Sequence, residues 1–195
     1  MLCAEVRLKC SKIVGLLLNS ALCTTGVKMK KPTFNLDGAG EMLPEDFVLA
    51  IGGVGERRNI ERMKKAVKGY NLIISGVTIP WLTEEELPLL YNSAKVLLYP
   101  SLYEGFGLPI LEAMKCGLPV ITSKNSSMPE VAGDAAEYAN PLDIEDIRIK
   151  LEGVMNNEKQ RNQMIERWFK QANKFSWDKT ANETAALYKD LYKRN

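Results

Sequence analysis

Short apolar runs alternate with segments of helical periodicity from Phe47 onward. The apolar runs, which we predict to be buried strands, are residues 47–51, 72–74, 96–99 and 119–122. The helical patterns are residues 59–68, a segment that begins at Thr83, and residues 108–115. This alternation is typical of a parallel sheet with helices on both faces. We therefore predict an α/β fold with a Rossmann-like, doubly wound sheet.

The C-terminal third is dominated by helical patterns, with three apolar stripes at helical spacing. We expect the aromatic residues on these stripes to lie in the core. Residues 1–44 show no clean alternation, so we divide the chain into an atypical segment, 1–44, and a domain, 45–195. The stripes are Ile144, Ile147, Leu151, Val154 and Met155; then Met164, Ile165, Trp168, Phe169 and Ala172; then Ala181, Thr184, Ala185, Tyr188, Leu191 and Tyr192.

One place breaks the alternation. Only Ser75 and Gly76 separate the apolar run 72–74 from the run 77–79. A crossover between adjacent parallel strands needs at least about 10–12 residues. The two runs therefore form either one bent strand or the junction left by a missing strand–helix unit.

Composition narrows the function classes. The net charge of +2 favours neither a nucleic-acid nor a membrane partner, and the apolar run 13–23 is too short to span a bilayer. The chain has no histidine, which excludes a histidine base or metal ligand within it. Its four cysteines lack metal-ligand spacing and fit reduced thiols. We therefore expect a cytoplasmic protein with no integral membrane segment and no metal.

The candidate site lies between residues 99 and 123. Parallel sheets of this kind bind ligands at the carboxyl ends of their strands, where the amides of the next helix point outward. Pro109 suits a first helical turn, while Gly105 and Gly107 allow a turn and a close approach of a ligand. This loop could therefore offer free amides to phosphate or sugar oxygens.

Two carboxylates flank the loop. Glu104 precedes the predicted helix and Glu112 lies one turn inside it, so both could face the same ligand. A carboxylate is a good two-oxygen acceptor for a vicinal diol. The alternative is purely structural, with Glu104 as a helix cap and Glu112 on a solvated face.

A basic pair follows the strand that ends at Gly53. Arg57 and Arg58 lie where this strand gives way to a helix, and an arginine there suits a diphosphate. We expect Asn59 to be the N-cap of that helix. The alternative is an ordinary surface pair, and of the two we expect Arg57 to be the surface member.

Together these residues resemble a known family. The run from Glu104 to Met114 is similar to the glutamate–seven–glutamate signature of retaining glycosyltransferases of family 4, which have the GT-B fold. The resemblance covers roughly residues 45–195, with its motifs in order. The other motifs are Gly52-Gly53 with residues 57–62, residues 85–91, Pro129-Glu130-Val131 and Phe175-Ser176-Trp177.

The resemblance implies a role for each site residue. Glu112 would bind the ribose hydroxyls, and Glu104 would lie near the donor hexose. Arg58 would meet the diphosphate, where many members have lysine, and would act with Glu104 in catalysis. The donor-binding set implied by the family is Gly53, Arg58, Pro80, Glu104, Gly105, Phe106, Gly107, Leu108 and Glu112, with the loop of Ile79, Pro80 and Trp81 bordering the base.

The family also implies a two-domain enzyme, of which this chain resembles the C-terminal, donor-binding half of the GT-B fold. Its substrate would be a nucleotide-diphospho-sugar, a hexose would be transferred with retention, and no metal or other cofactor is expected. A separate acceptor-domain chain is then a possible partner. The main alternative is a non-catalytic nucleotide-sugar-binding or partner-binding fragment of a split or truncated transferase. A GT-B sugar-nucleotide epimerase fits less well, because such enzymes use histidines that this chain lacks.

Overall fold

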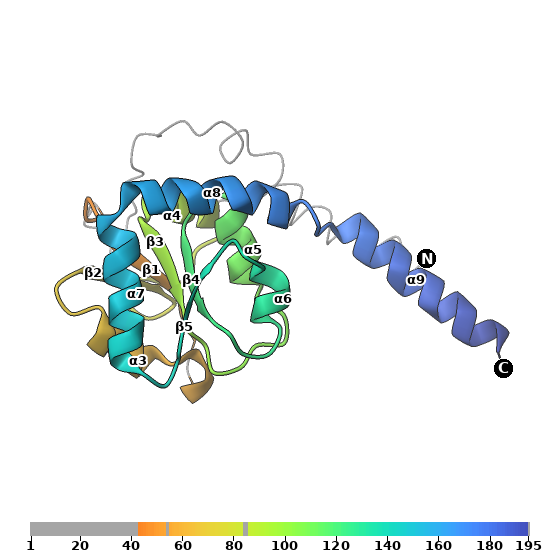
Figure 1. Cartoon of the computed structure of the whole chain (residues 1–195). Coiled ribbons are helices and arrows are strands. Elements are labelled where there is room, and N and C mark those ends of the chain that lie inside the picture. Colours follow the sequence, from red (N-terminus) through yellow and green to blue (C-terminus); the bar gives the residue numbers. More distant parts are fainter. Residues whose placement is uncertain (1–42, 54, 84–85, 195) are drawn as a thin grey trace.

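A five-stranded, fully parallel sheet forms the centre of the protein (Figure 1). The computed structural model describes residues 43–53, 55–83 and 86–194. The strand order is β2-β1-β3-β4-β5, which confirms the predicted α/β fold with a doubly wound parallel sheet. The strands are β1 (Phe47–Ile51), β2 (Asn71–Ser75), β3 (Val96–Tyr99), β4 (Val120–Ser123) and β5 (Glu137–Ala139).

Helices cover both faces of this sheet. The chain leaves β1 toward β2 on one side and leaves β3 toward β4 on the other, so right-handed crossovers place the two connecting helices on opposite faces. The first helix, α3 (Ile60–Ala66), packs against α7 (Ile144–Asn156). The second, α5 (Leu108–Lys115), contacts α4 (Leu87–Ser93), α6 (Met128–Ala132) and α8 (Glu158–Ala172).

The core is built from the continuous apolar runs. Every residue of β1, β3 and β4 is buried, as expected for strands covered on both faces. The end of β1 also packs tightly against β2. A Cβ atom at Gly52 would lie 2.7 Å from the carbonyl oxygen of Ser75, so only glycine fits there.

The predicted elements are confirmed, with small shifts at their ends. The predicted helix 59–68 is observed as α3, preceded by a 3-10 turn, η1 (Glu56–Arg58). The predicted start at Thr83 lies four residues before Leu87, where α4 begins. Thr83 and Glu86 bond to each other reciprocally, at 2.9 and 3.3 Å, in the pattern of a capping box, and the amide of Leu87 donates to the carbonyl of Thr83 at 3.0 Å. Neither α6 nor β5 is predicted by the sequence.

The break after β2 is a tight turn. Residues 76–78 form the turn, and Ile79 returns to make a single parallel bridge with Ser75. The run 77–79 is therefore not a second strand. The common doubly wound order is 3-2-1-4-5-6, and the observed order corresponds to it with the outer strand beside β2 removed.

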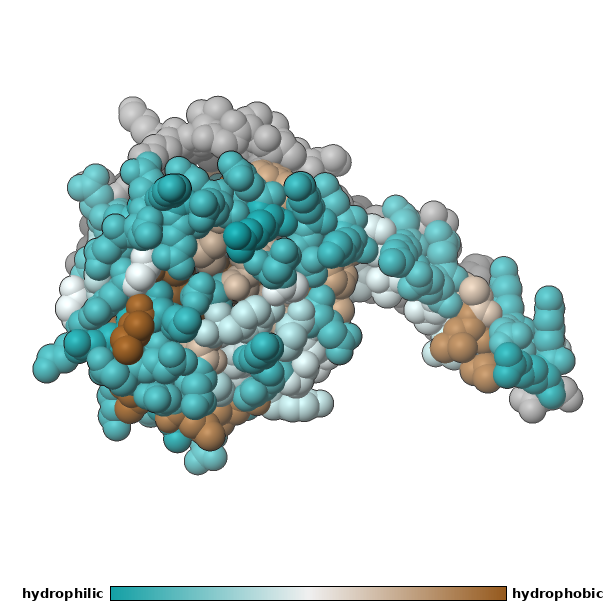
Figure 2. All heavy atoms as spheres, viewed as in Figure 1, coloured by the Kyte–Doolittle hydropathy of each residue, from teal (hydrophilic) through white to brown (hydrophobic). Residues whose placement is uncertain are grey.

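The last helix, α9 (Trp177–Lys193), extends away from the sheet (Figure 1). None of its residues is buried, and the exposed fractions of Tyr188 and Tyr192 are 70% and 86%. A brown apolar patch is visible toward its C-terminal end in Figure 2, where Leu187 and Leu191 are exposed. The expectation that this stripe lies in the core is wrong, because none of the residues of α9 is buried.

The predicted segment 1–44 lies almost wholly outside the described residues, as does the apolar run 13–23. Leu43, within that segment, is buried in the core of the domain. In the described part of the chain, no helix combines the length and the apolar character needed to cross a membrane.

Candidate functional site

The loops after β1 and β3 meet at the carboxyl edge of the sheet. These strands are neighbours, and their following connections leave toward opposite sides, which is the switch point where doubly wound sheets bind ligands. Two hydrogen bonds join the loops. The amide of Leu102 donates to the carbonyl of Arg57 at 2.9 Å, and the side-chain amide of Asn59 donates to the carbonyl of Pro100 at 2.9 Å.

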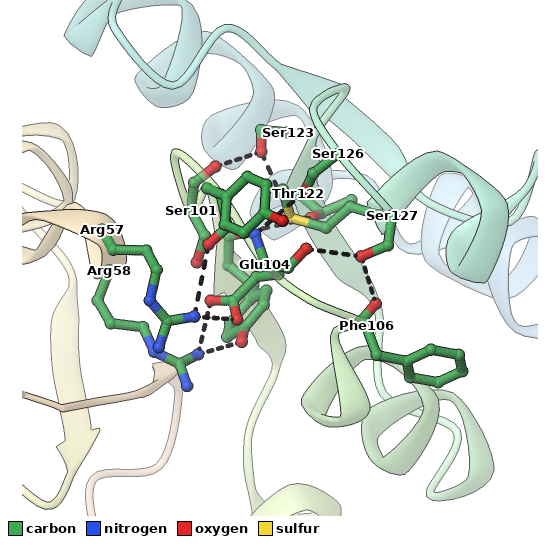
Figure 3. Close-up of polar contacts among 12 residues, drawn as sticks. Arg57, Arg58, Ser101, Glu104, Phe106, Thr122, Ser123, Ser126 and Ser127 are labelled. Carbon is green, nitrogen blue, oxygen red and sulfur yellow. Dashed lines mark hydrogen bonds and ion pairs between the residues drawn. The ribbon is translucent and has the colours of Figure 1, made fainter.

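A three-residue charge cluster lies at this junction (Figure 3). Glu104, only 5% exposed, faces both arginines of the β1 loop. Its Oε2 accepts from Arg57 Nη1 at 2.5 Å, and its Oε1 lies 3.0 Å from Arg58 Nη1. The structure therefore brings together Glu104 and Arg58, the two residues to which the family resemblance assigns a shared catalytic role. Glu104 is not a helix cap, since Gly107 occupies that position in α5.

Arg58 is held in place by Tyr99 at the end of β3. Its guanidinium carbon lies 5.2 Å from the centre of the Tyr99 ring, and its Nη1 donates to the Tyr99 hydroxyl. Burial raises the pKa of Tyr99, although the nearby Arg58 charge opposes this shift. Gly53 lies alongside, since a Cβ atom there would be 3.9 Å from Arg58 Nε.

Arg57 is more than a surface residue. Its side chain is 49% exposed, but its pair with Glu104 is shorter than that of Arg58. The expectation that Arg57 would be the surface member of the pair is confirmed, because the side chain of Arg58 is only 18% exposed, but Arg57 also contributes to the charge cluster. Both arginines can present positive charge to an anion at this edge of the sheet.

Asn59 occupies the predicted N-cap position of α3, but its side chain makes no capping bond. It is buried with φ at 61°, and its side-chain amide reaches the carbonyls of Pro100 and Pro141, at 2.9 and 2.6 Å. Asparagine tolerates this left-handed backbone better than most residues. Asn59 thus ties the β1 loop to the loops after β3 and β5.

The loop before α5 presents free backbone amides. The amides of Gly105, Phe106, Gly107 and Leu108 donate to no residue that the structure describes. Gly107 has φ at 98°, a conformation that favours glycine, and Pro109 follows in the first turn of α5. These amides lie at the positive end of a helix dipole. The loop therefore contains amides that could donate to an anion, as the sequence predicts.

Glu112 faces a different partner from Glu104. Its Oε2 accepts a hydrogen bond of 2.7 Å from the hydroxyl of Tyr91 in α4. Burial raises the pKa of Glu112, and the bond from Tyr91 partly offsets this shift. The alternative of a solvated surface glutamate is thus excluded. No contact joins Glu112 to the arginine cluster, so the two glutamates would meet a ligand at separate points.

The remaining predicted residues lie at the surface around this edge of the sheet. Pro80 is exposed and follows the bridge at Ile79 directly. Trp81, 64% exposed, lies over Gly76, where an added Cβ would be only 2.4 Å from the indole ring. Phe106 and Leu108 are partly exposed, and Phe106 contacts Phe175 edge-to-face at 6.0 Å. Within the described ranges, no group of three or more acidic or cysteine side chains could hold a metal ion.

Sequence reasoning missed the polar segment 122–127, which includes the last two residues of β4 and the turn after it and lies against the β3–α5 loop. Side chains of this segment bond to the loop backbone at successive positions. A run of hydroxyl and amide residues at the carboxyl end of a predicted strand was the available signal. The bonds reach the carbonyls of Tyr99 (from Thr122), Ser101 (from Ser123), Leu102 (from Asn125), and Glu104 and Phe106 (from Ser127).

Residues 31–171 match the family model described as glycosyl transferases group 1. The chain belongs to this family. It is 34% identical over 177 residues to O-antigen chain mannosyltransferase B of Escherichia coli, covering 75% of this chain and 46% of that protein. It is also 34% identical over 117 residues to an MMP α-(1→4)-mannosyltransferase of Mycolicibacterium hassiacum, covering 58% of this chain and 28% of that protein. The chain thus spans less than half the length of these relatives.

Solved structures support the same fold. The sucrose-phosphate synthase of Thermosynechococcus elongatus superposes with a TM-score of 0.70 at 22% identity, covering 78% of this chain and 47% of that one. The C-terminal domain of a glycosyl transferase group 1 family protein from Francisella tularensis superposes with a TM-score of 0.55 at 20% identity, covering 66% and 85%. The structural neighbours are GT-B glycosyltransferases, and the fold of this chain is that of one GT-B half.

Proposed function

We propose that this domain binds the donor of a retaining hexosyl transfer, a nucleotide-diphospho-sugar, within glycosyltransferase family 4. The observation that carries the proposal is the juxtaposition of free amides at residues 105–108 with two arginines at the switch point of the sheet. Such a site matches a diphosphate, which needs several donors and positive charge at once. The match to the glycosyl transferases group 1 model supports a sugar as the attached group.

Each residue then has a role in donor binding. The amides of residues 105–108 and the guanidinium of Arg58 would bind the diphosphate, with Gly53 leaving room beside Arg58. Glu112 would accept bonds from the ribose hydroxyls through the oxygen that Tyr91 leaves free. Pro80 would border the base, and Glu104 would lie near the hexose. A cytoplasmic location is part of this proposal.

Catalysis would depend on stabilising the leaving group. The bond between the anomeric carbon and the diphosphate oxygen breaks with its electron pair going to the diphosphate, while the sugar passes through an oxocarbenium-like state. Negative charge therefore grows on the diphosphate. Arg58 is pre-oriented by Tyr99 and Glu104, so it would meet that charge without reorganising. With fixed arginine charges in place, the proposal requires no metal ion.

The acceptor would be held by a further domain, such as a separate acceptor-domain chain. Holding an acceptor hydroxyl in line with the anomeric carbon can contribute roughly 7–11 kcal/mol of the barrier lowering. The described residues form one GT-B half, and the relatives are more than twice as long as the matched region. We therefore expect this chain to bind the donor but not to transfer its sugar by itself.

A second candidate is a nucleotide-sugar-binding module without turnover. It is favoured by the junction after β2, where Ile79 to Trp81 follow the turn directly and no described strand lies outside β2. Donor binding at this edge would then be weaker than in a complete domain. A radiolabelled transfer assay, with and without a supplied acceptor-domain chain, separates the two candidates. Transfer with the added chain supports the enzyme half, and no transfer in either case supports the binding module.

Calorimetry tests donor binding itself. The 195-residue chain is titrated with UDP, GDP and ADP and with their hexose conjugates, including mannose conjugates in view of the relatives. We expect one nucleotide series to bind, and we expect Glu112→Ala to weaken it by roughly tenfold or more through lost charge-assisted bonds. Glu61→Ala is the control, since Glu61 is 79% exposed and pairs only with Lys64 among the described residues. No heat with any ligand at millimolar concentration would contradict the proposal.

A further inference from the structure

Ser127 uses its hydroxyl in an unusual way. It occupies the N-cap position of α6, where a serine side chain normally accepts a bond from its own helix, but it makes no such bond. Its hydroxyl instead points to the β3–α5 loop (Figure 3). It donates in a bifurcated bond to the carbonyl oxygens of Glu104 and Phe106, at 3.0 and 2.9 Å.

This bond fixes the direction of two amides. In a trans peptide unit the C=O and N–H bonds point in opposite directions. The carbonyl of Glu104 shares its unit with the amide of Gly105, and the carbonyl of Phe106 shares its unit with the amide of Gly107. Because Ser127 holds both carbonyls, both N–H groups face away from it. Neither amide donates to a described residue.

The neighbouring residues of the same segment hold the loop from the same side. Ser126 accepts a bond of 3.0 Å from the amide of Glu104, and its backbone takes a left-handed conformation, with φ at 48°. Such a conformation is uncommon for serine. Ser123 donates to the carbonyl of Ser101 at 2.5 Å. The loop backbone is therefore fixed along its length before any ligand arrives.

We propose that Ser127 is a positioning residue for the donor diphosphate: its hydroxyl turns the Gly105 and Gly107 amides toward the phosphate oxygens. Ser127 itself does not touch the donor. This inference rests on the proposed function, because it assigns the free amides to the diphosphate. It adds a residue outside the glutamate–seven–glutamate run to the determinants of donor affinity.

The test measures how much the diphosphate adds to binding. Affinities for a nucleoside, by ligand-observed NMR, and for its diphosphate, by calorimetry, are compared in the wild-type chain, Ser127→Ala and Ser127→Thr. The diphosphate gain is the ratio of the affinity for the nucleoside diphosphate to the affinity for the nucleoside. We expect Ser127→Ala to reduce this ratio by roughly tenfold, which corresponds to about one lost charge-assisted bond, and to leave the nucleoside affinity unchanged. Ser127→Thr, which keeps the hydroxyl, should restore the gain.

Ser93→Ala is the matched control. The Ser93 hydroxyl also bonds a carbonyl, that of Leu89 at 2.8 Å, but within α4. Ser127→Gly covers the case in which Ser127→Ala fails to fold, since glycine is nearly as good as serine at an N-cap and lacks the hydroxyl. Loss of the diphosphate gain in Ser127→Gly, with Ser93→Ala like wild type, supports the inference.

Three results are adverse, and they are distinguishable. If the wild-type chain binds no nucleoside diphosphate, the proposed function is wrong. If it binds one and Ser127→Ala and Ser127→Gly keep the full diphosphate gain, the role of Ser127 is wrong and the proposed function stands. An equal loss of nucleoside and diphosphate affinity would mean that Ser127 merely supports the fold, which also overturns the inference.

Discussion

Glu104→Gln should lower the stability of the domain and raise its affinity for a free nucleoside diphosphate. Glu104 is buried between two arginines, and its single negative charge offsets one of their two positive charges. Glutamine has the same shape but no charge. The substitution would then raise the net charge of the three-residue cluster from +1 to +2, so it tests whether Glu104 competes with an incoming anion for the arginines.

The stability cost follows from the burial of each pair. In the pair with Arg58, the side chains are 18% and 6% exposed, so loss of its charge should cost roughly 1.5–3 kcal/mol. Arg57 is 49% exposed, and its pair should add only about 0–1 kcal/mol. A loss of about 1.5–4 kcal/mol in a domain of this size corresponds to a fall in Tm of roughly 3–16 °C.

The affinity gain follows from Coulomb's law. A phosphate charge about 6 Å from the Glu104 carboxylate would be repelled by roughly 0.7 kcal/mol in water and more in a less polar site. Removing that repulsion should tighten diphosphate binding by roughly three- to tenfold. Calorimetry and thermal unfolding measure the two effects, with Glu61→Gln as the exposed-charge control. Unchanged or weaker diphosphate binding, with the fold intact, would refute the reasoning.

Three further outcomes follow from the structure. Tyr91→Phe removes the bond that lowers the pKa of Glu112, so the pH below which nucleotide affinity is lost should move upward. Measuring Kd as a function of pH tests this, and an unchanged pH profile would contradict it. Because burial raises the folded pKa of Glu112, its carboxylate is a penalty that grows as pH rises through that pKa. Glu112→Gln should therefore raise Tm at pH 7, and the gain should vanish below the unfolded value of 4.5; a lower Tm at pH 7 would argue against the shift. Gly76→Ala should lower stability by about 2 kcal/mol or more, because φ is +80° and the new Cβ would clash with the Trp81 ring. Gly69→Ala is the control, because φ is +98° there but no atom lies near the new Cβ, so it measures the backbone cost alone, about 1–2 kcal/mol. Equal losses of Tm in the two variants would show that the clash with Trp81 is relieved.

Local patterns were enough to predict the strands β1 to β4. The strands β1, β3 and β4 are continuous apolar runs, and α5 is marked by Gly107 before it and Pro109 in its first turn. The strand β5 has three residues and α6 has five, which is too short for a periodic signal. The apolar stripe on α9 correctly predicts a helix. Burial of that stripe depends on which element packs against it, and sequence periodicity carries no information about that partner.

The site was only partly predictable for a related reason. The sequence places Arg58 and Glu104 at strand ends, but their contact depends on β1 and β3 being neighbours in the sheet. Asn59 and Ser127 both occupy N-cap positions, yet each bonds to a loop that is distant in sequence. Capping rules describe local alternatives, and tertiary partners overrode them here.

Binding at the β3–α5 loop is tested most directly by NMR of the chain labelled with ¹⁵N-glycine. The chain has 14 glycines, and those from Gly52 to Gly153 sample the domain from the β1 loop to α7. With the nucleoside diphosphate that binds, the proposal predicts shifts and slowed exchange for the amides of Gly105 and Gly107. Gly69, after α3, and Gly153, within α7, should remain unchanged. Perturbation of Gly69 or Gly153 without any change at Gly105 and Gly107 would contradict a diphosphate site at this loop.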